Sequence, residues 1–131
     1  MIFRFGITTP ANTPSTSRQR TTLKLASGII HHLDVQFPPG PSGTLHLHIN
    51  NSLHQIFPFN TGEAFAADNV NISFRDFINF QEPPFDLTAF TWNTDTANDH
   101  FIIIRIGILP ARIAAPWLQT LTERLASVFG G

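Results

Sequence analysis

Short segments in which apolar and polar residues alternate, each closed by a turn signal, recur along the chain and restrict its fold more than any other feature. In the clearest case, aliphatic residues at positions 45, 47 and 49 alternate with His46, His48 and Asn50. A period of two places the two sets on opposite faces of a β-strand. The Pro- and Gly-rich stretch Pro38–Gly43 just before it is a turn. About eight such segments predict an all-β, antiparallel jelly roll or β-sandwich.

The expected strands cover residues 3–7, 21–25, 29–37, 45–49, 53–57, 70–74, 87–92 and 100–109. In the third of these, the odd positions from Ile29 to Phe37 are expected on one face. Residues 77–80 fit either a helical turn or a strand end. The last strand, His100–Leu109, is the most apolar, with residues on both faces that favour burial. It is therefore predicted to be central and covered on both sides.

Three parts are expected along the chain. Residues 1–20 form an N-terminal strand and an extended arm, because Thr8–Arg20 is rich in Pro, Thr and Ser and has no apolar period. The arm is either a linker or a segment that orders on a neighbouring subunit. Residues 21–110 form the sandwich. Residues 111–131 contain an amphipathic helix with an apolar face that must be buried on its own domain or on a neighbour.

Composition narrows the possible functions. Only 13% of the 131 residues are charged, about half the ~25% typical of globular domains. A surface with few charges suits close packing against other subunits, although carbohydrate-binding proteins share it. A net charge of −1 argues against nucleic-acid binding, which requires a basic patch. The chain has no cysteine for a disulfide or a thiolate zinc site.

No targeting or membrane segment is expected. Arg4 interrupts the apolar N-terminus where a signal peptide would need an unbroken apolar core. No segment approaches the ~20 apolar residues that span a bilayer. The C-terminal helix has few basic residues for anionic lipid, so docking on protein is preferred to docking on a membrane.

The histidines are the only candidate metal ligands in number. His46 and His48 project to one face, as in the metal sites of cupin barrels, and His54 could join them. The glutamate and second histidine of a full cupin pattern are missing at the required spacing, so a solvent or interface face is favoured over a metal. No cofactor is expected.

No enzyme active site is predicted. A triad could be drawn through Asp95, Asp99 and His100, but no G-x-S-x-G elbow accompanies them. Trp92 and a set of phenylalanines could form a sugar platform, yet core packing is the favoured interpretation. The phenylalanines concerned are Phe57, Phe59, Phe65, Phe74, Phe77 and Phe80.

Five motifs between Leu23 and Leu109 carry a resemblance to a known family. They are the segments 25–30 (LASGII), 37–40 (FPPG), 57–60 (FPFN), 83–87 (PPFDL) and 92–95 (WNTD). This stretch, about two-thirds of the chain, resembles the small jelly-roll structural proteins of tailed phages and related viruses. The resemblance implies a capsid decoration or minor capsid protein, often a homotrimer, located in the virion and assembled in the host cytoplasm. It implies no catalytic residues.

The sequence therefore predicts a non-enzymatic structural protein that assembles with itself, trimers favoured, and with other virion proteins. The expected subunit contacts come from the arm and the C-terminal helix: Thr8, Pro10, Pro14, Arg18, Arg20, Trp117, Leu118, Leu121, Leu125 and Val128. A lectin-like module using Trp92 and loop acids, with calcium as an option, is the first alternative. A cupin-like metalloenzyme using His46 and His48 with His54 or His100 is the second, because the sandwich fold is compatible with all three.

Overall fold

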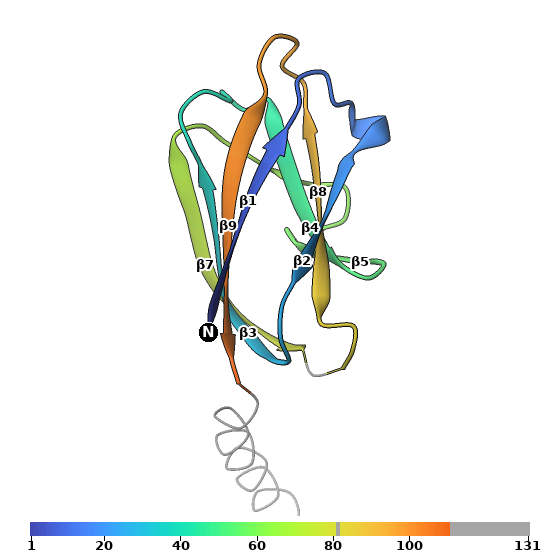
Figure 1. Ribbon diagram of the computed structural model, residues 1–131, viewed down its shortest axis with the longest axis vertical. Helices are drawn as coiled ribbons and strands as arrows, with labels where there is room; N and C mark the ends of the chain where they lie inside the picture. The colour runs from blue at the N-terminus through green and yellow to red at the C-terminus, as the bar shows by residue number, and fades with distance from the viewer. Residues whose placement is uncertain (81, 111–131) are drawn as a thin grey trace, which may run out of the picture.

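The computed structural model describes residues 1–80 and 82–110, and within them the chain is a sandwich of two antiparallel sheets (Figure 1). The strands are β1 (Ile2–Thr9), β2 (Gln19–Lys24), β3 (Gly28–Phe37), β4 (Leu45–Asn51), β5 (His54–Phe57), β6 (Phe65–Ala66), β7 (Val70–Phe80), β8 (Asp86–Asn93) and β9 (His100–Leu109). One short 3₁₀ turn, η1 (Ser15–Ser17), precedes β2. The predicted all-β sandwich is confirmed at this level.

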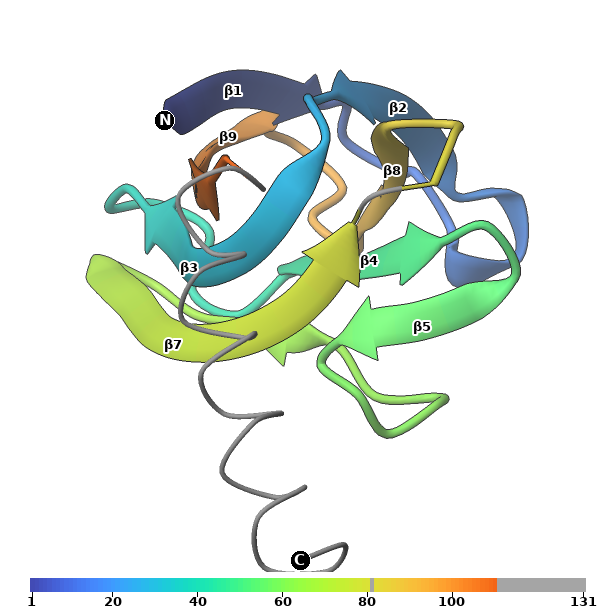
Figure 2. The same cartoon turned by 90° about the horizontal axis from the view of Figure 1, so that it is seen from below.

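Strands far apart in sequence are neighbours in each sheet. The first sheet has the order β1-β9-β3-β7, and the second has the order β2-β8-β4-β5, with β6 also paired to β4. All strand pairs are antiparallel. The view from below shows the two sheets facing one another, with β1, β9, β3 and β7 on one side and β2, β8, β4 and β5 on the other (Figure 2).

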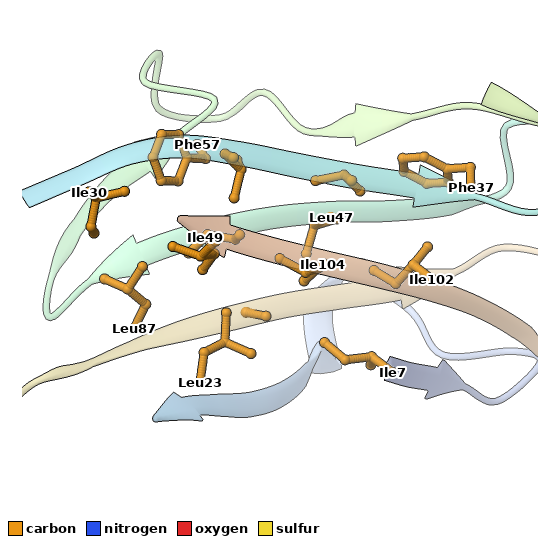
Figure 3. Packing of buried hydrophobic residues seen from close by; sticks show 14 of the residues in the cluster. Ile7, Leu23, Ile30, Phe37, Leu47, Ile49, Phe57, Leu87, Ile102 and Ile104 are labelled. Carbon is orange, nitrogen blue, oxygen red and sulfur yellow. The ribbon is translucent and has the colours of Figure 1, made fainter. Parts of the chain in front are cut away.

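The core fills the space between the sheets with aliphatic side chains and a few phenylalanines (Figure 3). Isoleucines 102, 104, 106 and 108 of β9 are fully buried, as are residues 45, 47 and 49 of β4. These are the faces that the alternation predicts. Burial of each such side chain contributes about 1.5–3 kcal/mol, which supplies the stability of a domain without disulfides.

Strand β3 departs from simple alternation. A register shift between Ile30 and His32 interrupts its pairing with both β7 and β9. Ile30 therefore joins the core cluster with Leu33, whereas His31 is half-buried at the irregularity. The prediction that odd positions share one face is wrong before residue 33. The bulge is compatible with Gly107 opposite it, since a Cβ there would lie 3.0 Å from His31 Nε2.

The segment expected to be an extended arm is largely folded onto its own domain. Thr8 and Thr9 belong to β1, and Gln19 already begins β2. Between them, Asn12 N donates to Asp95 O at 2.8 Å, and Thr13 forms a bridge with Asn93. Residues 77–80, left open by the sequence, continue β7 as strand.

The two faces of β9 differ. The strand is central, between β1 and β3, as expected. Its second face is only partly covered: Phe101 is 40% exposed, and Ile103 and Leu109 are half-buried within the described part of the chain. The predicted helix between residues 114 and 129, with Trp117, Leu118, Leu121, Leu125 and Val128, lies outside the described residues.

Candidate functional site

Three pairs of residues, each two positions apart, meet on the outer face of the second sheet. Arg18 immediately precedes β2 and Arg20 is its second residue, His46 and His48 lie on β4, and Phe90 and Trp92 lie on β8. Residues two apart on a strand point to the same side. Because β8 lies between β2 and β4, its two aromatic rings have arginines on one side and histidines on the other.

These six side chains form two parallel rows across the strands, which we call the aromatic ladder. In the first row, Arg18 Cζ lies 4.3 Å from the ring centroid of Trp92, and the His46 ring stacks on Trp92 at 4.9 Å with an interplanar angle of 1°. In the second row, Arg20 Cζ lies 5.2 Å from the Phe90 centroid, and His48 stacks on Phe90 at 4.8 Å and 12°. Guanidinium stacking on aromatic faces is favourable, by roughly 0.5–1 kcal/mol at exposed sites.

A hydrogen-bonded chain joins the two rows and defines the proton position on His48. Arg18 Nη1 lies 2.6 Å from His48 Nε2, and His48 Nδ1 lies 2.8 Å from Asn50 Oδ1. A guanidinium can only donate, so Nε2 must accept. The imidazole is therefore neutral, with its proton on Nδ1 donated to Asn50. Arg18 also donates from Nε to Ser15 O at 2.9 Å, which ties η1 to the ladder.

Burial lowers the pKa of His48, and the nearby positive charge of Arg18 lowers it further, while the hydrogen bond to Asn50 raises it. The side chain is only 5% exposed, because Phe90 and Arg18 cover it. Protonation would place a second positive charge against Arg18 and abolish the acceptor at Nε2. The ladder is thus built around an uncharged histidine.

A groove lies on the solvent side of the part of the ladder that contains the two arginines, His48 and Phe90. One hollow of about 430 Å³ is lined by η1, Arg18, Arg20, His48, Asn50 and Phe90. A second, of about 550 Å³, continues from Arg18, His48 and Asn50 toward Leu53, His54, Phe59 and Gly62. Both volumes fall in the ~300–1,000 Å³ range of ligand sites. Leu53 and Phe59 are 94% and 83% exposed, so apolar side chains stand at its rim.

The arrangement does not favour a metal at the candidate histidines. Both nitrogens of His48 are engaged, and the Arg18 guanidinium occupies the direction of its lone pair. His46 Nδ1 donates to Thr44 O at 3.1 Å, and His54 is exposed on β5. Among residues 1–80 and 82–110, no three metal-ligating side chains come together.

The aromatic residues separate into two groups. Phe57 and Phe80 are buried, and Phe65 and Phe74 pack against the core, as expected. Trp92 instead lies on the outer face of the sheet, and Phe59 and Phe77 are exposed. The core interpretation is wrong for these three. Alternation along β8 turns Leu87, Ala89, Thr91 and Asn93 inward, which leaves the rings of Phe90 and Trp92 on the outer face.

The loop acids support the fold at the end of the sandwich. Asp95 accepts hydrogen bonds from the amides of Ala97 and Asn98 and from His100 Nε2, the last at 2.8 Å. The amide of Ala97 and the ring of His100 lower the pKa of Asp95 to about 2. Asp99 accepts from Ala11 N at 2.9 Å. These carboxylates hold the loop before β9 and the residues after β1 together.

The residues expected at subunit contacts fall in two places. Thr8, Pro10 and Pro14 lie on or just after β1, with exposed side chains. Arg18 and Arg20 belong to the aromatic ladder, a role that sequence reasoning missed. The signal was present as R-x-R, H-x-H and F-x-W, but their meeting depends on the order β2-β8-β4, which no local pattern encodes.

No family model matches this chain, and neither a curated protein nor a solved structure matches it. Within residues 1–80 and 82–110, the structure has no helix with the length and apolar character needed to cross a bilayer.

The His48→Gln variant should weaken the dependence of stability on acid pH. The lowered pKa of His48 means that, below its ordinary value of 6.5, the unfolded chain binds more protons than the folded one. Stability is therefore full above about pH 6.5 and falls as the pH drops toward the folded pKa. Glutamine keeps an acceptor for Arg18 but does not titrate. We expect a shallower decline in the free energy of unfolding between about pH 7 and 5, measured by urea denaturation.

His54→Gln is the matched control, since His54 is exposed on the adjacent strand. His48→Gln should still lose some stability between about pH 7 and 5, because burial also lowers the pKa of His31. The free energy of unfolding should decline a second time between pH 3.8 and about pH 2, because the pKa of Asp95 is lowered in the folded protein. This second decline should be the same in wild type and in His48→Gln. An equal slope in wild type and His48→Gln would contradict the assignment.

Proposed function

We propose that this chain is a non-enzymatic structural subunit of the jelly-roll class that assembles with itself in a virus particle, most simply as a trimeric capsid decoration or minor capsid protein. The observation that carries the proposal is the strand order. Setting aside the two-residue β6, eight strands are divided as β1-β9-β3-β7 and β2-β8-β4-β5. Successive strands from β1 to β4 alternate between the two sheets, which is the pattern of two interleaved Greek keys.

The outer face of the first sheet supports assembly. Phe101, Ile103 and Leu109 of β9 and Ile2 of β1 lie on this face, and Ile2 is 74% exposed. Apolar side chains that share one uncovered face of a sheet are candidates for contact with another subunit. The low charged fraction of the chain means that few ions would be desolvated there.

Light scattering after size exclusion tests the proposal. We expect the full chain at three times its 14.6 kDa mass, and a variant lacking residues 111–131 in a smaller species. Circular dichroism of the truncated chain should retain the β signal, which separates loss of assembly from loss of fold. A full chain that stays monomeric at high concentration would overturn the self-assembly proposal. An unchanged oligomer after truncation would remove the C-terminal segment from it.

Carbohydrate binding is the second candidate, and the groove beside the ladder is the observation that favours it. The version with a neutral sugar stacked on Trp92 is disfavoured, because Arg18 and His46 flank that ring from opposite strands. The version with calcium on loop acids is also disfavoured, because Asp95 and Asp99 already accept hydrogen bonds from their own loops.

A further inference from the structure

We propose that the groove along the aromatic ladder binds a saccharide that bears a carboxylate, with Arg18 and Arg20 holding the carboxylate. The proposal concerns the outer face of the second sheet and does not depend on whether the chain assembles through the first.

Two guanidinium groups stand side by side at this groove without an acidic partner. Within the described residues, the side chain of Arg20 forms neither a hydrogen bond nor an ion pair, and the guanidinium of Arg18 bonds only to Ser15 O and to the neutral His48. On the other sheet, by contrast, Arg105 Nη1 contacts Asp34 Oδ2 at 3.2 Å. The positive charge at the groove is therefore uncompensated and available to an anion.

Both arginines lie over an aromatic ring of β8 in the absence of a ligand, which favours one placement of each guanidinium. Arg4 and Arg75 also lack an ion pair in the described chain, but neither is recorded over an aromatic ring. The guanidinium of Arg20 donates no hydrogen bond in the described chain, so its N–H edges can match the two oxygens of a carboxylate, whereas Arg18 offers only the N–H groups that do not donate to Ser15 O and His48 Nε2. Preorganisation reduces the rotamer entropy lost on binding. The ladder thus presents one free guanidinium fork, at Arg20, and beside it the remaining N–H groups of Arg18.

The rest of the lining suits a saccharide. Ser15, Thr16 and Ser17 present hydroxyl groups at one wall of the groove. Asn50 lines both hollows and uses its Oδ1 to accept from His48, while its amide Nδ2 donates to no group in the described chain. The exposed rings and side chains of Phe59 and Leu53 offer apolar contact for the C–H faces of a sugar. Mixed polar groups around an apolar surface are typical of such sites.

Other polyanions fit less well. An acidic peptide commonly binds by adding a strand at a sheet edge, whereas this groove lies over the face of the sheet, where β8 and β4 already satisfy each other's backbone groups. Nucleic acid binding gains most of its affinity by releasing counterions along many phosphates, and two arginines on a chain of net charge −1 release few.

The test is a titration of the full chain with tetragalacturonate, followed by ¹⁵N NMR and calorimetry. We expect saturable binding with amide shifts concentrated in residues 15–20, 48–50 and 90. Arg20→Gln should weaken binding by about tenfold or more, the loss expected for one charge-assisted hydrogen bond. Arg20→Lys should recover only part of it, because an ammonium lacks the planar fork.

Three controls decide between the possible outcomes. Arg4→Gln removes the same charge from β1 on the other sheet and should leave binding unchanged; an equal loss there would mean non-specific attraction. The fully methyl-esterified tetrasaccharide keeps the sugar and removes the charge, so equal binding of the ester would overturn the carboxylate assignment. Absence of binding to tetragalacturonate, or tighter binding of tetraglutamate, would overturn the saccharide proposal, whatever the oligomeric state of the protein.

Discussion

Gly28→Ala should destabilise the protein by about 3–5 kcal/mol, a large part of the ~5–15 kcal/mol that holds a domain folded. Gly28 begins β3 with φ +149°, a region that side chains rarely adopt, and a Cβ there would lie 2.3 Å from Leu109 O and 2.7 Å from Ile108 Cγ2. Backbone strain of about 1–3 kcal/mol and overpacking of similar size add together. The measurement is the free energy of unfolding in urea.

Gly43→Ala is the matched control because it isolates the strain. Gly43 also has a positive φ, +83°, but a Cβ there meets nothing within 4 Å. We expect a loss of about 1–2 kcal/mol for this variant. If the two variants lose equal stability, the contact between the start of β3 and the end of β9 is not the cause, and the packing described for this corner is incorrect.

Asn93→Ala should destabilise the protein by about 2–4 kcal/mol, because Asn93 is fully buried and satisfies three backbone groups. Its Nδ2 donates to Thr9 O and Asn98 O, and its Oδ1 accepts from Asp95 N. Removing the side chain leaves these groups without partners inside the sandwich, where water cannot replace all of them. Urea denaturation gives the energy, and hydrogen exchange at the Asp95 amide reports the local opening.

Asn71→Ala provides the comparison, since Asn71 is exposed on the edge strand β7 and the change should stay within about 0.5 kcal/mol. A loss below about 1 kcal/mol in Asn93→Ala would show that the loop before β9 is held by other contacts. The bonds from Ala11 N to Asp99 Oδ1 at 2.9 Å and from Asn12 N to Asp95 O at 2.8 Å would then be the connections that hold it.

Local patterns in the sequence predict most strands because alternation and turn chemistry act over a few residues. The strand beginning at Leu45 has its predicted faces, and Ile102, Ile104, Ile106 and Ile108 are all inside. Pro38–Gly43 is a turn, as its residues require. In both strands one face is much more apolar than the other, so the two-residue period and the burial of apolar side chains predict the same inward face.

Prediction fails where neighbours in space, not in sequence, decide the outcome. The bulge in β3 changes which residues face the core, so that Ile30 points inward in place of His31. It depends on the register with β7 and β9 and on the absence of a side chain at Gly107. Residues 77–80 become strand because β3 supplies their hydrogen bonds. The segment after β1 is polar and without period, yet Asn12 and Thr13 dock on the chain near Asn93 and Asp95, some eighty residues away.

The candidate site depends most strongly on tertiary structure. The sequence by itself determined that His46 and His48 share a face and that Trp92 alternates with Thr91, since the two-residue period is local. Only the folded sheet decided that Arg18 and Arg20 stand beside these residues, because hydrogen bonding places β2 and β4 on either side of β8. Both faces of β8 carry apolar residues, and packing against the first sheet buries the face with Leu87 and Ala89, which leaves Phe90 and Trp92 on the outer face.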